Sequence, residues 1–109
     1  MEKYCLVYST FPDEREAFRI SEQALKEKLA ACANIVPHIY SIYRWQSKVE
    51  RSSEVLVIMK TTKKLLGRLA AVVKEMHSYK VPEIIALPII YGHKSYLEWI
   101  GGSVLKSNR

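Results

Sequence analysis

The order in which strand-like and helix-like patterns follow one another constrains the fold of this chain more than any other feature. Residues 4–10 are apolar and rich in β-favouring side chains, which is typical of a strand. Two later segments carry apolar residues at helical spacing, and β-rich segments lie between and after them. The series is strand, helix, strand, strand, helix, strand and short helix, over residues 4–10, about 14–31, 34–46, 54–60, 63 to about 77, 83–91 and 95–100.

This order is that of the split βαβ arrangement in the ferredoxin-like fold. Because crossovers between strands are right-handed, both long helices should lie on one face of an antiparallel sheet. The polar segment 46–53 has no Asn-Gly or Gly-x turn, so we predict a long central hairpin whose strands extend into it. Pro37 should bend or interrupt this hairpin. We therefore predict one α+β domain over residues 1–109, a ferredoxin-like βαββαβ sandwich with an added C-terminal helix.

Local signals place the ends of the predicted helices. Asp13 stands where it can open the first helix, near a proline and before acidic residues of the first turn. Lys28 falls within the apolar arc of that helix, so its side chain is expected to snorkel to solvent. Thr61 or Thr62 can cap the second helix. The glycine pair at 101–102 should end the third helix.

Charge and composition exclude several classes of function. The 109 residues include 17 Lys and Arg against 11 Asp and Glu, but the basic residues are spread out, so no nucleic-acid partner is expected. No apolar run is long enough to span a membrane, and the first residues lack the apolar region of a signal peptide. We therefore expect a cytoplasmic protein with no membrane partner. In that compartment Cys5 and Cys32 should be buried, reduced thiols.

The strands predict that the protein associates with itself. An antiparallel sheet with one face in water should alternate apolar and polar residues. Residues 6–8, 55–59 and 83–91 are instead apolar on both faces. Two helices can cover only one face, and an exposed apolar sheet would be an aggregation liability. We predict association through the second face, for which symmetry alone allows either a dimer or a trimer. The alternative is that the C-terminal helix and the long hairpin shield enough of this face.

Six segments that follow one another along about residues 4–100 carry a recognisable combination of residues. The segments are Ser9-Thr10-Phe11-Pro12-Asp13-Glu14, Glu27-Lys28-Leu29-Ala30-Ala31-Cys32-Ala33-Asn34-Ile35, Ser41-Ile42-Tyr43-Arg44-Trp45, Lys60-Thr61-Thr62, His77-Ser78-Tyr79-Lys80-Val81-Pro82-Glu83-Ile84 and Tyr96-Leu97-Glu98-Trp99-Ile100. In this order they resemble the CutA family of divalent-cation tolerance proteins. The resemblance implies a tight homotrimer of ferredoxin-like protomers in the cytoplasm, with a role in tolerance of divalent metals, above all copper.

His77 and Glu83 are the best candidates for metal ligands. His77 closes the second helix and Glu83 opens the next strand, so a turn between them can bring both side chains together. Imidazole nitrogen and carboxylate oxygen suit a weakly bound divalent ion such as Cu(II) or Zn(II). The alternative is structural, with His77 capping the helix C-terminus near the negative end of its dipole.

A second set of candidates flanks the hairpin. Tyr43 and Trp45 precede its polar segment, while Glu54 and Lys60 flank the apolar returning strand. In the family that the chain resembles, these positions lie near a subunit interface and a cleft. A lysine with aromatic neighbours can hold a small anion. The alternative is an interface anchor together with an ion pair.

Nothing in the sequence predicts an enzyme. The chain has no Gly-rich phosphate loop, no Gly-x-Ser-x-Gly and no His-Glu-x-x-His. We therefore expect a non-catalytic metal-tolerance protein. The alternative function is a trimeric module that binds a small ligand or a protein in signalling.

Overall fold

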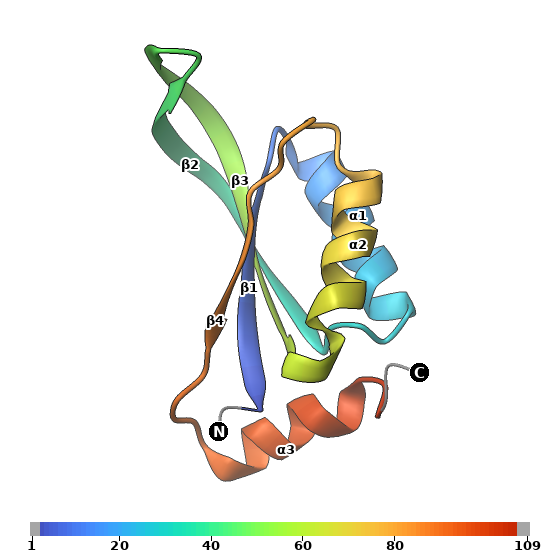
Figure 1. Ribbon diagram of the computed structural model, residues 1–109. Helices are drawn as coiled ribbons and strands as arrows, with labels where there is room; N and C mark the ends of the chain where they lie inside the picture. The colour runs from blue at the N-terminus through green and yellow to red at the C-terminus, as the bar shows by residue number, and fades with distance from the viewer. Residues whose placement is uncertain (1–2, 107–109) are drawn as a thin grey trace.

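The computed structural model describes residues 3–106. Its strands form one antiparallel sheet in the order β2-β3-β1-β4. Helices α1 and α2 cover one face of this sheet, and α3 lies across the end at which β1 begins (Figure 1). This arrangement confirms the predicted α+β, ferredoxin-like class. The elements are β1 (Tyr4–Phe11), α1 (Glu14–Lys26), β2 (Cys32–Trp45), β3 (Lys48–Thr62), the 3-10 turn η1 (Lys63–Leu65), α2 (Leu66–Met76), β4 (Ile84–Pro88) and α3 (Lys94–Ser103).

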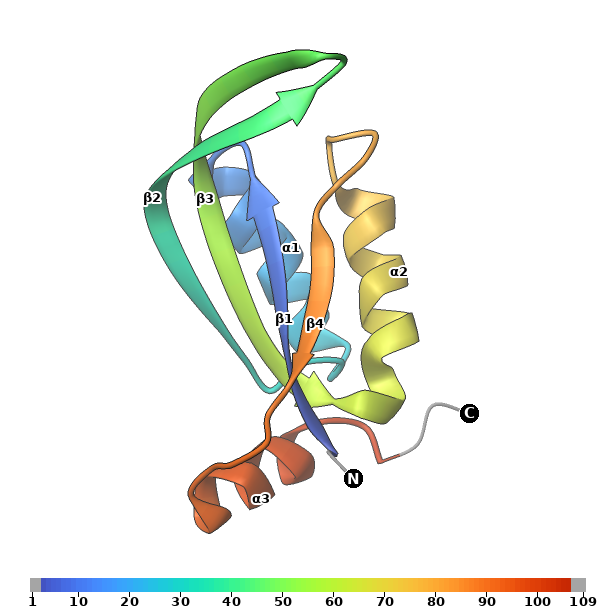
Figure 2. The same ribbon diagram turned by 60° about the vertical axis from the view of Figure 1, so that its left-hand side comes forward.

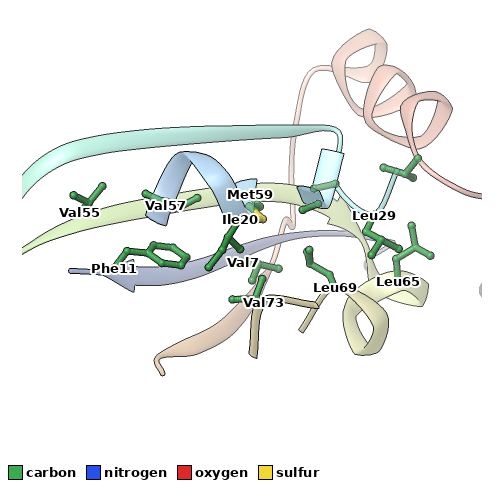
Figure 3. Packing of buried hydrophobic residues seen from close by; sticks show 14 residues of the cluster. Val7, Phe11, Ile20, Leu29, Val55, Val57, Met59, Leu65, Leu69 and Val73 are labelled. Carbon is green, nitrogen blue, oxygen red and sulfur yellow. The ribbon is translucent and has the colours of Figure 1, made fainter. Parts of the chain in front are cut away.

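The hydrophobic core lies between the sheet and the two covering helices (Figure 3). Strands β1 and β3 contribute alternate residues to it, as the strand period requires, and α1 and α2 contribute one stripe each. Burial of each large apolar side chain stabilises the fold by roughly 1.5–3 kcal/mol. The largest fully buried apolar side chains are Phe11, Ile20, Leu29, Met59, Leu65, Leu69 and Ile100.

Helix α1 ends at Lys26, earlier than the predicted end near residue 31. Lys28 adopts a left-handed backbone conformation with φ 59°, and its N–H donates to the Leu25 carbonyl at 2.9 Å. The Leu29 N–H donates to the Ala24 carbonyl at 2.9 Å, which completes a Schellman motif. The prediction was wrong because this motif usually has glycine where Lys28 stands. Lys28 is exposed in the turn instead of snorkelling from a helix.

The predicted helix caps are confirmed at one helix and wrong at the other. The Asp13 side chain accepts a hydrogen bond from the Glu16 N–H at 2.9 Å and caps α1. Thr61 is fully buried, and its hydroxyl donates instead to the Leu29 carbonyl at 2.6 Å. Thr62 precedes η1 but makes no capping bond with its side chain. A 3-10 turn therefore leads into α2 and satisfies the early backbone groups.

Strands β2 and β3 form the long hairpin that the sequence predicts. Only Gln46 and Ser47 separate them, with positive φ angles of 49° and 68°. Two successive left-handed residues are the geometry of a type I′ turn, which suits the twist of a hairpin even without glycine. The pairing shifts between Val36 and Ile39, so the predicted interruption at Pro37 is confirmed.

The last two elements differ in length from the prediction. β4 is shorter than the predicted strand over 83–91 because its partner β1 begins at Tyr4, whose carbonyl accepts the last bond, from the Ile89 N–H, at 2.9 Å. Helix α3 is longer than predicted and runs through Gly101 and Gly102. A Cβ atom at Gly101 would lie 3.3 Å from the Tyr4 hydroxyl oxygen. That glycine therefore permits close packing of α3 on β1 and does not end the helix.

The second sheet face, opposite α1 and α2, is apolar as the sequence predicts. We call it the open face. Its residues on β1 and β3 are half-buried, while on β4 Ile85 is 51% and Leu87 is 42% exposed. The register of the strands places these side chains side by side, and the apolar members on the three strands are Leu6, Tyr8, Leu56, Ile58, Ile85 and Leu87.

Candidate functional site

The distal half of the hairpin, residues 40–53, projects past the sheet and the helices (Figure 1). We call this segment the arm. The segment between α2 and β4 lies at the same end of the molecule (Figure 2). Between the two lies a cavity of about 890 Å³, here called the arm cavity. Its lining residues are Thr10, Tyr40, Ser41, Ile42, Tyr43, Trp45, Ser52, Glu54, Ser78, Tyr79, Lys80, Val81 and Glu83.

The arm cavity brings together four of the six predicted site residues. Tyr43, Trp45, Glu54 and Glu83 line it, although they come from three separate stretches of the chain. The turn between α2 and β4 carries Glu83 toward the arm. The antiparallel register places Ser41 opposite Ser52 and Tyr43 opposite Glu50, so the aromatic residues of β2 on the arm lie beside β3.

Lys60 is not part of the arm cavity. It lies on the same strand as Glu54 but six residues further on, which is about 20 Å in an extended chain. Its ammonium donates to the Asn34 amide oxygen, lies 3.7 Å from the Cys32 sulfur, and stands 5.9 Å from the centre of the Tyr96 ring. The predicted grouping of Lys60 with the aromatic residues of the hairpin was therefore wrong in space.

A hydrogen bond between Tyr79 and Glu54 joins the two walls of the arm cavity. The Tyr79 hydroxyl donates to a carboxylate oxygen of Glu54 at 2.8 Å. Burial raises the pKa of the Tyr79 hydroxyl above its ordinary value, and the hydrogen bond and negative charge of Glu54 raise that pKa further. The phenol therefore stays protonated and acts as a donor at neutral pH. Glu54 is only 8% exposed, so its carboxylate forms part of the inner wall.

His77 lies behind the wall of the arm cavity, with its side chain fully buried. Its Nε2 is 2.8 Å from the Thr10 carbonyl oxygen, and its Nδ1 accepts a hydrogen bond from the Tyr79 backbone N–H at 3.0 Å. These two contacts fit a neutral imidazole with the proton on Nε2. The ring also stacks on Phe11, with centroids 4.6 Å apart.

His77 thus has a structural role, but its side chain does not cap the helix as predicted. His77 is the C-cap residue of α2, but its side chain does not reach the last carbonyls of that helix and instead holds the chain at Tyr79. The carboxylate of Glu16 supports the same turn, because it accepts from the Ser78 N–H at 2.9 Å and lies 3.4 Å from His77 Nδ1. These contacts fix the backbone from which Tyr79 reaches Glu54.

The described residues do not form a closed metal site on one chain. No three His, Cys, Asp or Glu side chains gather within residues 3–106 in a way that could hold a metal ion. Both ring nitrogens of His77 already have partners, so a metal bound there would have to displace the Thr10 carbonyl or the Tyr79 N–H. Glu83 is the predicted ligand whose side chain is available in the arm cavity.

Two further predictions concern the burial of the cysteines and the lack of a membrane-spanning segment. Cys5 and Cys32 are both thiols. Cys5 is buried as predicted, whereas Cys32 is only half-buried because it opens β2 on the open face, opposite Lys60. Within residues 3–106, no helix is both long and apolar enough to cross a membrane.

Sequence reasoning missed two aromatic residues of the site. Tyr79 and Tyr40 line the arm cavity, yet neither carries a spacing that signals a ligand. Tyr79 lies within the segment from His77 to Ile84 that supports the resemblance to a known family. The alternation of the hairpin could have placed Tyr40 on the arm, but not the segment that faces it.

Comparison with known proteins agrees with this fold. Residues 5–103 match the family model described as CutA1 divalent ion tolerance protein. The chain is 46% identical over 100 residues to the divalent-cation tolerance protein CutA of Thermus thermophilus, covering 92% of this chain and 95% of the relative. It is 47% identical over 102 residues to the chloroplastic CutA 1 of Oryza sativa, covering 94% of this chain but only 58% of that protein.

A solved structure of a relative is also similar over its whole length. The crystal structure of CutA1 from Oryza sativa superimposes with a TM-score of 0.93 at 45% sequence identity, and the match covers 97% of both chains. The family model, the identity of the relatives and the superposition all extend over nearly the whole described chain. The chain therefore belongs to the CutA1 divalent ion tolerance family.

Proposed function

We propose that this chain is a divalent-cation tolerance protein that acts without catalysis, as a homotrimer in the cytoplasm. Membership of the CutA1 family supports the role in tolerance.

The exposed apolar surface supports self-association, and the resemblance to the CutA family supports three chains as its number. On the open face, Ile85 and Leu87 are 51% and 42% exposed, and on the arm Tyr40 and Ile42 are 77% and 72% exposed. Soluble monomers rarely leave apolar patches of this extent uncovered, because their contact with water is unfavourable. A closed ring of three chains buries the open face of each protomer.

Light scattering at micromolar concentration tests the trimer. We expect a mass three times that of the 12.6 kDa chain. A mass of 12.6 kDa would overturn the proposed assembly, and a mass of twice this value would replace the trimer with a dimer.

The observation that carries the cation-binding part of the proposal is that the carboxylate of Glu83 is available in the arm cavity, with His77 behind the wall of that cavity. Carboxylate oxygen is a suitable ligand for divalent ions, and an imidazole would add affinity for Cu(II) or Zn(II). We propose that Glu83 is the direct ligand and that His77 joins it only when the Tyr79 N–H is released. Weak binding follows, because one chain offers too few ligands for a closed site.

Calorimetric titration with Cu(II) and Zn(II) tests these roles. We expect Glu83→Gln to weaken binding several-fold, and the double change His77→Ala with Glu83→Ala to weaken it further. Glu98→Gln is the matched control, since it removes an exposed carboxylate on α3, away from the arm cavity. Unchanged affinity in the double variant would refute the proposed ligands.

The size of the arm cavity favours a second candidate function, a trimeric module that binds a small ligand or a protein in signalling. Small-molecule sites usually have volumes of about 300–1,000 Å³ and combine apolar walls with a few polar groups. The arm cavity, at about 890 Å³, has both properties. Binding of an organic ligand that is independent of metal would favour this alternative over metal tolerance.

A further inference from the structure

The arm cavity combines aromatic rings with negative charge. Aromatic ring faces attract cations through their quadrupole, and tryptophan does so most strongly. Two carboxylates, Glu54 and Glu83, lie in the same lining as one ammonium, that of Lys80, so the charged groups leave a net negative charge. The aromatic lining residues are Tyr40, Tyr43, Trp45 and Tyr79.

The burial of Glu54 strengthens the attraction between its carboxylate and a cation in the cavity. Glu54 is 8% exposed, and within residues 3–106 its carboxylate forms no ion pair. The Tyr79 hydroxyl satisfies one of the roughly four acceptor positions of the carboxylate. A buried carboxylate without a counter-ion is unfavourable, so a cation that enters the cavity gains more attraction there than at an exposed carboxylate.

The position of Lys60 reverses the ligand charge that the sequence predicts. Lysine beside the aromatic residues of the hairpin would favour a small anion, but Lys60 contacts Cys32 and Asn34 near the far end of β3. The lysine that does line the cavity, Lys80, is exposed and can extend into solvent. The deep charge of the cavity is therefore the carboxylate of Glu54.

The lining is better matched to an organic cation than to a bare metal ion. A metal ion needs several oxygen, nitrogen or sulfur ligands, and the described residues supply no group of three such ionisable ligands. An alkylated ammonium instead contacts ring faces with its alkyl groups and needs only a nearby negative charge. We propose that the arm cavity binds an organic ammonium ion, held between the aromatic rings and the Glu54 carboxylate.

This inference deepens the proposed function and rests on it, because both require a cavity that attracts cations. The two differ in the residues on which they depend. Divalent metal binding depends on Glu83 and His77, whereas the ammonium ion depends on Trp45 and Glu54. A metal titration and an ammonium titration on the same variants therefore separate the two.

Titration of the assembled protein with tetramethylammonium tests the proposal. Binding is followed by amide chemical shifts in a buffer that contains a chelator, so that metal ions do not contribute. We expect saturable shifts at residues that line the arm cavity. Tert-butanol, which has a similar size and no charge, is the matched ligand control and should bind at least ten-fold more weakly.

Two variants and one control define the site. Glu54→Gln keeps an acceptor for Tyr79 but removes the charge, and we expect it to weaken tetramethylammonium binding about ten-fold. Trp45→Leu keeps apolar volume but removes the ring, and a loss of at least three-fold is expected. Lys60→Gln lies outside the cavity and should leave the affinity unchanged. Light scattering verifies that each variant keeps the mass of the parent assembly.

Each outcome decides between cation recognition and simple apolar binding. Equal affinity for tetramethylammonium and tert-butanol would overturn the proposal, as would full affinity in Glu54→Gln. Absence of any shift with tetramethylammonium would overturn it as well, and the proposed metal binding would stand or fall separately on the Glu83→Gln titration. Weakening by Lys60→Gln would show that tetramethylammonium binding depends on residues outside the arm cavity and would contradict this assignment.

Discussion

One hairpin passes through two environments, and the comparison of its halves explains much of the molecule. Between Val55 and Thr61, the residues of β3 that face the helices are at most 3% exposed, since α1 and α2 cover them. On the arm, Tyr40, Ile42 and Val49 are 77%, 72% and 67% exposed. Both halves have the same antiparallel pairing and are built from β-favouring residues.

The difference shows that strand formation and burial are separate properties of this chain. Strand pairing continues into the arm because a tight two-residue turn holds the register. Burial stops where the helices stop. The arm therefore keeps apolar side chains that the single chain does not cover, and the arm cavity forms at the boundary between the two halves.

Two identical substitutions on β3 should show the largest contrast. Val57→Ala removes methyl groups from a fully buried position and should lower the free energy of unfolding by about 2 kcal/mol. Val49→Ala removes the same groups from the arm, where the valine is 67% exposed, and should cost less than about 0.5 kcal/mol. Urea unfolding of both variants measures the difference. Equal losses would mean that the arm is buried in the assembly as fully as the core.

Substitution on the arm should affect assembly more than folding. Ile42→Asp places a charge on an exposed apolar residue of the arm, which is 72% exposed in the single chain. We expect the dissociation constant of the trimer to rise about ten-fold, or about 1.4 kcal/mol, because the charge must lose water on association. Light scattering over a dilution series measures this, and circular dichroism controls for the fold. Unaltered dissociation would remove Ile42 from the interface.

The hydrogen bond between Tyr79 and Glu54 should contribute about 1 kcal/mol to the free energy of unfolding. Tyr79→Phe removes the donor, so urea unfolding at neutral pH should show a loss of this size. The raised pKa of Tyr79 gives the pH dependence its sign, because the unfolded chain loses that proton at lower pH than the folded chain. The contribution is complete below roughly pH 10 and is lost as the pH rises toward the folded pKa.

Comparison of the two proteins at high pH isolates this effect. The parent protein should lose stability more steeply above roughly pH 10 than Tyr79→Phe does, because the other tyrosines are common to both. Parallel curves would show that the Tyr79 hydroxyl has no raised pKa in the folded protein.

Glycine at two of the three left-handed positions within residues 3–106 should give the smallest effects. Lys28→Gly, in the turn after α1, should raise stability by about 0.5–1 kcal/mol by relieving a side chain held at φ 59°. Ser47→Gly, at φ 68° in the hairpin turn, should gain less than about 0.5 kcal/mol, since the tip of the arm has little packing to reinforce. Thermal unfolding of both variants measures the gains. A larger gain at Ser47 would contradict the view that the arm contributes little to stability.

The fold was predictable because its signals are local. Apolar residues recur on α2 at helical spacing, and the strands of β1 and β3 have continuous apolar runs, so their order alone gives the ferredoxin-like arrangement. The end of α1 was not predictable, because Lys28 takes a conformation that sequence patterns assign to glycine. The length of β4 was also missed, since its end depends on where β1 begins.

The site was predictable only in part, for a related reason. Tyr43, Trp45 and Glu54 could be assigned to one hairpin from the sequence, and the turn after α2 suggested Glu83. Lys60 shares a strand with Glu54, but closeness in sequence along a strand means separation in space. Tyr79 was missed because its contact with Glu54 joins residues 25 positions apart.

The sequence by itself determined the order of the elements, the faces that they bury and the apolar second face of the sheet. Periodicity and turn residues encode these properties, because each depends on neighbours within a few positions. Only the tertiary structure decided which polar side chains share the arm cavity, that Lys60 lies outside it, and that both nitrogens of His77 are engaged. Those outcomes depend on how distant segments pack, and no local pattern carries that information.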